Sequence, residues 1–115
     1  MKPRAVCAVV LVSSAVACGA SVPPPNDQWA AAQADVGRAQ SGGAPDNPAA
    51  KLHLQLAQED LQKAKQLIGD DNKRATTLTE LARTEAQLAL SLAKTSTAQD
   101  AARKANADLE KVQAR

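Results

Sequence analysis

Alanine and leucine recur at alternating spacings of three and four through most of this chain, and almost nothing larger accompanies them. Trp29 is the only aromatic residue among 115, with no Phe or Tyr. Spacings of three and four place side chains on one face of an α-helix, because a helix turns once every 3.6 residues. Alanine, glutamine and leucine also favour helix over strand. We therefore expect an all-α fold with a thin, alanine-rich core.

The first two helices are predicted at about residues 27–41 and 48–68. Asn26 or Asp27 can cap the first, and its apolar face consists of Trp29, Ala32, Val36 and Ala39. Asn47 followed by Pro48 is a stronger start signal, because proline lacks an N–H that the first helical position does not need. Gly69 can end the second helix in a left-handed conformation.

The third helix is predicted over about residues 71–115, with Asp70 or Asp71 as its cap. The connection before it is so short that helices 48–68 and 71–115 must fold back on each other as an antiparallel hairpin. One apolar face of the third helix comprises Ala75, Leu78, Ala82, Ala89, Leu92 and Ala93, with Leu81 and Leu88 at its edge.

A second apolar stripe follows on this helix, roughly opposite the first at 100° per residue. It comprises Ala98, Ala101, Ala102, Ala105, Leu109 and Val112. Ser96 and Gln99 fit a capping box that would start a separate fourth helix. A continuous helix of about 65 Å is favoured, because no strong breaker lies between Ala93 and Ala98. The expected architecture is a three-helix antiparallel bundle or hairpin with a long C-terminal helix.

Residues 1–17 have the pattern of an export signal: Lys2 and Arg4, an apolar run over 5–12, then small residues. The apolar run is too short for a bilayer, which needs roughly 20 residues. Ala15-Val16-Ala17-Cys18 is similar to the lipobox of bacterial lipoproteins, although alanine stands where leucine is usual. We predict cleavage after Ala17 and attachment of lipid, including palmitate, to Cys18. The alternative is plain secretion with a free amino-terminal cysteine.

A lipidated Cys18 would hold the protein at a membrane, since two or three acyl chains anchor stably. Gly19 after it, rather than aspartate, points to the outer membrane, with the protein facing the periplasm. Residues 18–25 form a proline-rich tether of only ~20 Å reach, and residues 26–115 form the helical domain.

Processing would also change the charge of the chain. Loss of Lys2 and Arg4 lowers the basic count from 14 to 12, equal to the 12 acidic residues. A net charge of zero leaves no electrostatic case for binding nucleic acid. Cys7 would leave with the signal, so no disulfide within the chain is expected.

Two stretches together resemble a known family. Leu54-x-x-Ala57-x-x-x-Leu61-x-x-Ala64 is followed by a short polar turn and then by Ala75-x-x-Leu78-x-x-Leu81-Ala82-x-x-Glu85-Ala86-x-Leu88-Ala89. This pattern resembles domain-of-unknown-function family 4398, found in Gram-negative lipoproteins and often placed ahead of an OmpA-like peptidoglycan-binding domain. The resemblance covers roughly residues 29–93 and implies a small, all-helical envelope lipoprotein. No OmpA-like domain follows Arg115, so it does not imply peptidoglycan binding, and the family brings no catalytic residues.

Candidates for catalysis or metal binding are few. His53 is the only histidine, and Asp60, seven residues later, is too far along the helix for a direct hydrogen bond, so a structural, partly buried histidine is the favoured interpretation. Helix capping explains Asp70, Asp71 and Asn72 better than a calcium loop does, because a calcium loop needs a distal glutamate in register. We expect no enzyme activity, no metal and no cofactor.

Glu85 lies near the centre of the apolar face of the third helix, which is unusual for a carboxylate. It can pair with Lys63, Lys65 or another base on a neighbouring helix, specify helix register, or mark a docking site. A partly exposed glutamate in a loose bundle is the plainer alternative. The candidate partner-binding residues are Glu85, Ala98, Ala102, Ala105, Leu109 and Val112.

Two non-enzymatic functions follow from these features. The first is a lipid-anchored helical scaffold or adaptor for unidentified proteins of the cell envelope. The alternative is a self-associating spacer, similar to the major coiled-coil lipoprotein that ties the outer membrane to the cell wall. That protein ends in a lysine that forms the covalent wall link, whereas this chain ends in Arg115. The link is therefore not expected, and homo-oligomerisation stays open.

Overall fold

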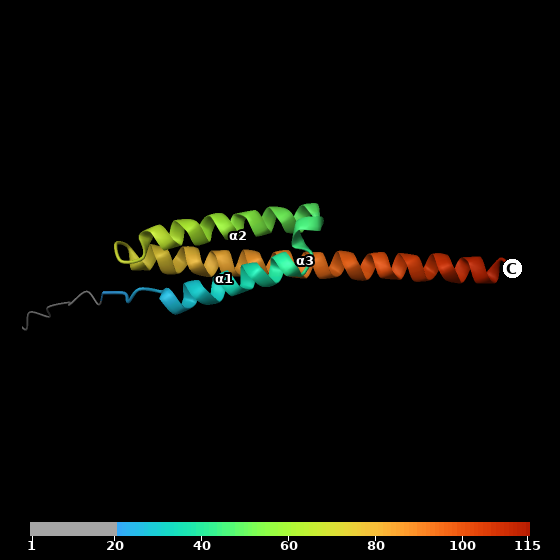
Figure 1. The fold of residues 1–115 in the computed structure, drawn as a ribbon, viewed down its shortest axis with the longest axis horizontal. Coiled ribbons are helices and arrows are strands. Elements are labelled where there is room, and N and C mark those ends of the chain that lie inside the picture. Colours follow the sequence, from blue (N-terminus) through green and yellow to red (C-terminus); the bar gives the residue numbers. More distant parts are fainter. Residues whose placement is uncertain (1–20) are drawn as a thin grey trace, which may run out of the picture.

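The computed structural model describes residues 21–115, and within them the chain is all-α (Figure 1). Its elements are α1 (Asn26–Ser41), a short 3-10 turn η1 (Ala44–Asp46), α2 (Pro48–Leu67) and α3 (Asn72–Gln113). α1 and α3 run in the same direction, and α2 runs against both (Figure 1). The predicted all-α class, three helices and long C-terminal helix are confirmed. The predicted signal segment, Cys18 and the start of the tether lie outside the described residues.

The core of the bundle is built from small residues at alternating spacings of four and three. The buried positions are Ala75, Thr79, Ala82, Ala86, Ala89 and Ala93 on α3, Ala50, Leu54, Ala57, Leu61 and Ala64 on α2, and Ala32, Asp35, Val36 and Ala39 on α1. Side chains this small let helix backbones approach closely, so many weak contacts replace the large side chains of an ordinary core. The mean spacing of 3.5 residues is the one at which coiled-coil helices keep facing each other.

The buried face of α3 differs from the expected one: it includes Thr79 and Ala86, which the expected face lacks. Leu78 and Leu92 are only partly buried, whereas Thr79 is 1% exposed. The Thr79 hydroxyl donates to the carbonyl oxygen of Ala75 at 2.8 Å, so its polar atom is satisfied within its own helix. A threonine bonded in this way packs like a small apolar residue, which hydrophobic periodicity alone does not reveal.

The starts of α2 and α3 follow the predicted capping chemistry, and the start of α1 does not. Asn47 Oδ1 accepts from the Ala50 N–H at 2.9 Å, and Asp71 Oδ1 accepts from the Arg74 N–H at 3.0 Å. The expectation that Asn26 or Asp27 caps α1 is wrong. The helix already contains both residues, and the carbonyl of Pro25 accepts from the Trp29 N–H at 2.9 Å without any side-chain cap. Proline at this boundary limits the backbone to a φ that suits the turn into the helix.

The connection from α1 to α2 presses against α3 at Gly42. A Cβ at this position would lie 2.3 Å from Leu90 Cδ1 and 2.9 Å from the Arg38 carbonyl oxygen, so only glycine fits without movement. Gly43 follows with φ +89°, in the left-handed region that glycine adopts at little cost. This pair of glycines sets how closely the corner of the bundle packs on α3.

α3 continues as one helix far beyond the bundle, as favoured from the sequence; no fourth helix starts at Ser96 (Figure 1). Its last buried residue is Ala93, and every residue from Thr97 to Arg115 is exposed. We call residues 94–113 the arm; at 1.5 Å per residue it is about 30 Å long. Within the arm, Arg103 pairs with Asp100, and Lys111 pairs with Asp108 at 3.4 Å. Such pairs and the many alanines support helix without a neighbour.

Residues 21–25 and the arm lie at opposite ends of the domain (Figure 1). Asn72 Nδ2, at the start of α3, donates to the Val22 carbonyl oxygen at 2.8 Å. This bond holds Val22 beside the first turn of α3, while the arm extends from the other end of the domain (Figure 1). Within residues 21–115, no helix is both long and apolar enough to cross a membrane.

Candidate functional site

Glu85 on α3 contacts His53 on α2, which is a base on a neighbouring helix as expected, although it is neither of the two lysines. His53 Nδ1 lies 2.5 Å from Glu85 Oε2, with side chains 28% and 21% exposed. Lys63 and Lys65 are not partners of Glu85: Lys63 pairs with Asp60 and Glu59 on its own helix, and the Lys65 ammonium lies over the Trp29 ring. Since an ionised carboxylate can only accept, Nδ1 must carry the shared hydrogen. The pair joins the two helices of the hairpin.

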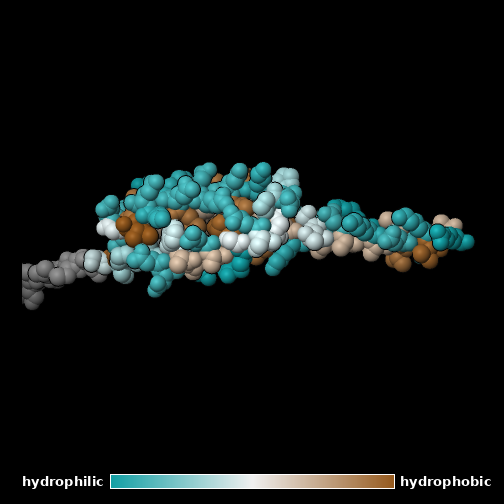
Figure 2. Space-filling model, in the orientation of Figure 1, coloured by the Kyte–Doolittle hydropathy of each residue, from teal (hydrophilic) through white to brown (hydrophobic). Residues whose placement is uncertain are grey.

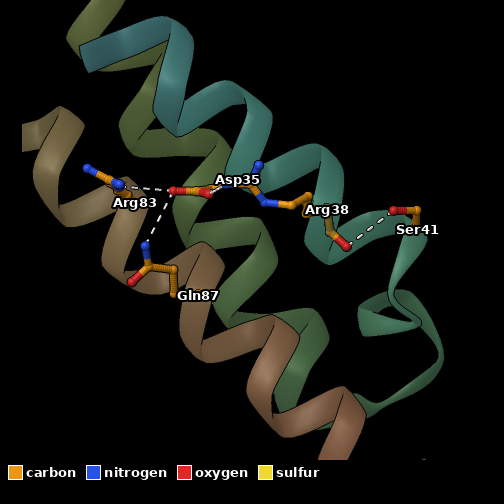
Figure 3. Close-up of polar contacts among 5 residues, drawn as sticks. All are labelled: Asp35, Arg38, Ser41, Arg83 and Gln87. Atoms are coloured by element: carbon orange, nitrogen blue, oxygen red, sulfur yellow. Dashed lines mark hydrogen bonds and ion pairs between the residues drawn. The ribbon is translucent and has the colours of Figure 1, made fainter.

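A buried carboxylate that the sequence did not indicate joins α1 to α3 (Figure 3). Asp35 is 4% exposed, and its Oδ2 accepts from Arg83 Nε at 3.0 Å and from Gln87 Nε2 at 3.4 Å. Its Oδ1 pairs with Arg38, one turn further along α1. A buried charge is tolerated only when it is paired and hydrogen-bonded. The only local signal was an acidic residue beside Val36 on a narrow apolar face.

Trp29 on α1 packs against α2 and is the one aromatic side chain of the bundle. It packs against the alanine core, and its Nε1 donates to the Leu61 carbonyl oxygen at 3.0 Å. The ammonium of Lys65 lies 5.3 Å from the ring centre, within cation–π range. A shallow groove of about 490 Å³ opens beside the ring, and glutamine side chains 33, 58 and 62 help to line it. These contacts give Trp29 a structural role.

The arm presents the second predicted stripe to solvent. Ala98, Ala102 and Ala105 are exposed, and Leu109 and Val112 are 59% and 72% exposed. Figure 2 shows one edge of the arm coloured for hydrophobic residues and the opposite edge for hydrophilic ones. Among residues 21–115 nothing packs against this stripe. Exposed large apolar side chains gathered on one face are typical of an interaction surface.

The predicted partner-binding residues therefore do not form one site. Glu85 is thirteen residues before Ala98 on the same helix, a separation of about 20 Å, and it is partly buried against His53. The exposed stripe alone has the geometry of a contact surface. In the part of the chain that the structure describes, no three His, Cys, Asp or Glu side chains lie close enough to hold a metal ion.

A protein-family model matches most of the chain. The family model described as "Domain of unknown function (DUF4398)" matches residues 27–105. The chain belongs to the DUF4398 family. No curated protein and no solved structure matches the chain.

The DUF4398 match extends beyond the residues that carried the resemblance in the sequence. It spans α1, α2 and the bundled half of α3, and it continues to Ala105, about midway along the arm. The beginning of the arm is therefore part of the DUF4398 domain rather than an appendage to it.

Proposed function

We propose that this DUF4398 protein is a non-enzymatic, lipid-anchored protein of the cell envelope, in which the bundle is a scaffold that carries the arm as a contact element. The observation that carries the proposal is the length of α3, which leaves residues 97–113 wholly exposed with an apolar stripe along one side. A helix exposed on all sides gains nothing from tertiary packing, so an apolar stripe along it has a use only when a partner covers it.

The positions of tether and arm support a role at a membrane surface. The Val22–Asn72 hydrogen bond places the end of the tether beside the start of α3, and a lipid on Cys18 would attach only a few residues before it. The arm extends from the opposite end of the domain. An anchor at one end and a contact surface at the other is an arrangement suited to an adaptor or scaffold in the periplasm, with the outer membrane as the site of attachment.

The anchoring part of the proposal is tested by labelling the full chain in cells with an alkyne analogue of palmitate. Wild type should be labelled and should sediment with membranes, whereas Cys18→Ala should lose the label. Cys7→Ala, within the apolar run of the signal, is the matched control and should keep it. Equal labelling of wild type and Cys18→Ala would exclude the lipid anchor.

The contact part of the proposal is tested by placing a photocrosslinking residue in the arm of the full chain. At Leu109, on the stripe, we expect an adduct of defined mass after irradiation. Lys111, two residues along, is exposed on the opposite side of the arm and is the matched control. Equal adducts from both positions, or none from either, would remove the arm as a contact element.

A further inference from the structure

A single exposed seam runs along nearly the whole of α3, over the bundle as well as the arm. Leu81, Leu88, Thr95, Ala102 and Leu109 lie seven residues apart, and Thr77, Thr84, Ser91, Ala98, Ala105 and Val112 lie seven apart between them; all eleven are exposed. We call these residues the outer seam. A sustained seven-residue repeat of apolar and small residues is the pattern of a left-handed coiled coil.

The outer seam is distinct from the face that builds the bundle. The positions that would extend the buried face of α3 beyond Ala93 are occupied by Ser96, Asp100, Arg103, Ala107 and Glu110. The core-facing side of the arm is thus polar, which means the arm is not built to be covered by a longer α1 or α2. The apolar side lies roughly opposite, where a helix from outside the bundle can reach it.

We propose that the occupant of the outer seam is α3 of a second copy of this chain, packed antiparallel and centred near Asp100. In an antiparallel pair of helices, a residue of one copy lies beside a residue of the other when their two numbers add up to a fixed sum. With a sum of 200, outer-seam residues of one copy face outer-seam residues of the other from Leu88 to Val112. This sum sets Leu88 against Val112 of the second copy, Ser91 against Leu109, Thr95 against Ala105 and Ala98 against Ala102, so each of the larger exposed side chains in this span is covered.

Charge complementarity selects this register and direction. Lys94 and Asp108 flank the outer seam on the same side. With the sum near 200, Lys94 of each copy lies beside Asp108 of the other copy, so the dimer contains this pair of opposite charges twice. Lys94 takes part in none of the ion pairs within residues 21–115. A parallel pair would instead bring Glu80 of one copy beside Glu85 of the other, and charges beside a coiled-coil seam decide partner orientation.

This inference deepens the proposed function and rests on its exposed arm, since it names the partner of the arm as another copy. The antiparallel pair is a rod with one bundle at each end. The two Asn72 residues, where the tethers meet the bundles, would lie about 84 Å apart along the rod. Val22 is hydrogen-bonded to Asn72, so only residues 18–21 are left to reach the lipid, about 12 Å at roughly 3.1 Å per residue. Both anchors can therefore reach one membrane only when the rod lies along its surface.

The test uses the full chain in cells, with differently tagged copies carrying Leu88→Cys or Val112→Cys and mild oxidation of isolated membranes. A disulfide needs Cα atoms within about 7 Å. We expect a dimer when the two variants are mixed, and none from either variant alone, because identical positions lie about 36 Å apart along an antiparallel pair. The chain without engineered cysteines is the background control, and Gln55→Cys, exposed on α2, is the control for random collision.

Disulfide dimers within each single variant, without a mixed disulfide between the two differently tagged variants, would overturn the antiparallel arrangement. No disulfide dimer in any combination would overturn self-association. If Leu109 forms a photoadduct with a different protein and no disulfide dimer is found, only this inference is excluded and the proposed function still holds. If neither a photoadduct nor a dimer is found, both are excluded.

Charge exchange gives an independent test that leaves the seam itself intact. Lys94→Asp should lower the yield of the mixed Leu88→Cys/Val112→Cys dimer about fivefold, since it places like charges together twice. Adding Asp108→Lys should restore the yield by reversing both pairs. Failure of the second substitution to restore it would contradict the proposed register.

Discussion

Glu85 on α3 and His53 on α2 share a hydrogen bond of 2.5 Å that crosses the hairpin near the middle of α3's bundled half. The two residues are 32 positions apart in the chain, yet both side chains are largely withdrawn from solvent. In a bundle whose core is mostly alanine, this pair is one of few contacts between α2 and α3 that depends on side-chain identity.

The His53–Glu85 pair should contribute to stability as a coupled unit. Glu85→Ala and His53→Ala should each lower the free energy of unfolding, and the double variant should lose less than their sum by about 1 kcal/mol, since a hydrogen bond to a charged group at a partly exposed site is worth about that much. Urea unfolding of all four proteins measures the coupling. Strict additivity would mean the contact does not form in solution.

Removing the charge of Asp35 should lower the free energy of unfolding less than removing the two arginines that pair with it. Asp35 is buried, whereas the side chains of Arg38 and Arg83 are 63% and 57% exposed. Removing both arginines strands a carboxylate in the core, so Arg38→Ala/Arg83→Ala should cost roughly 3 kcal/mol. Asp35→Asn leaves only solvated cations and should cost about 1 kcal/mol.

Denaturant midpoints of these variants test the asymmetry. Arg103→Ala, in a pair on the exposed arm, is the control and should change stability by less than about 0.5 kcal/mol. A larger loss from Asp35→Asn than from the double arginine variant would contradict the assignment of Asp35 as the buried member.

Gly42→Ala should destabilise the bundle by about 1–3 kcal/mol, because its Cβ would collide with Leu90 and with the Arg38 carbonyl. Gly37→Ala is the matched control: nothing lies within 4 Å of its Cβ, and alanine inside a helix should stabilise by about 0.5–1 kcal/mol. Thermal unfolding compares the two. A second change, Leu90→Ala, should restore part of the stability that Gly42→Ala removes. If it restores none, the collision with Leu90 is not the cause of the lost stability.

At a protein concentration low enough for both to be monomeric, the chain truncated after Thr97 should be as stable as the full chain, within about 0.5 kcal/mol, because the last buried residue is Ala93. Circular dichroism should show a loss of helix signal in proportion to the residues removed, with an unchanged unfolding midpoint. A fall in the midpoint would mean that the arm packs on the bundle.

Much of this fold could be predicted from the sequence, because the information lies close together along the chain. The Asn47–Pro48 start, Gly69 and the alternating alanine spacings define α2 and the hairpin from local chemistry alone. The continuity of α3 follows in the same way from the absence of a breaker between Ala93 and Ala98.

The partners in the polar contacts could not be identified from the sequence, because they depend on how helices align with each other. Asp35 meets Arg83 and Gln87 across 48 and 52 residues of chain. The sequence suggests a base on a neighbouring helix as the partner of Glu85, but it does not single out His53. Which residues of α2 and α3 face each other depends on how the turn between Leu67 and Asn72 aligns the two helices. A shift of one helical turn in that alignment would give Glu85 a different partner.

The most direct test is the distance between spin labels at Lys73 and Lys111 of α3, measured by pulsed electron paramagnetic resonance. The full chain is used, with Cys7 and Cys18 changed to serine, and the labelled protein is diluted with unlabelled protein. Thirty-eight residues of unbroken helix give a single narrow distance near 57 Å. A markedly shorter or broad distribution would mean that α3 breaks near Thr95 and folds back, leaving no free arm.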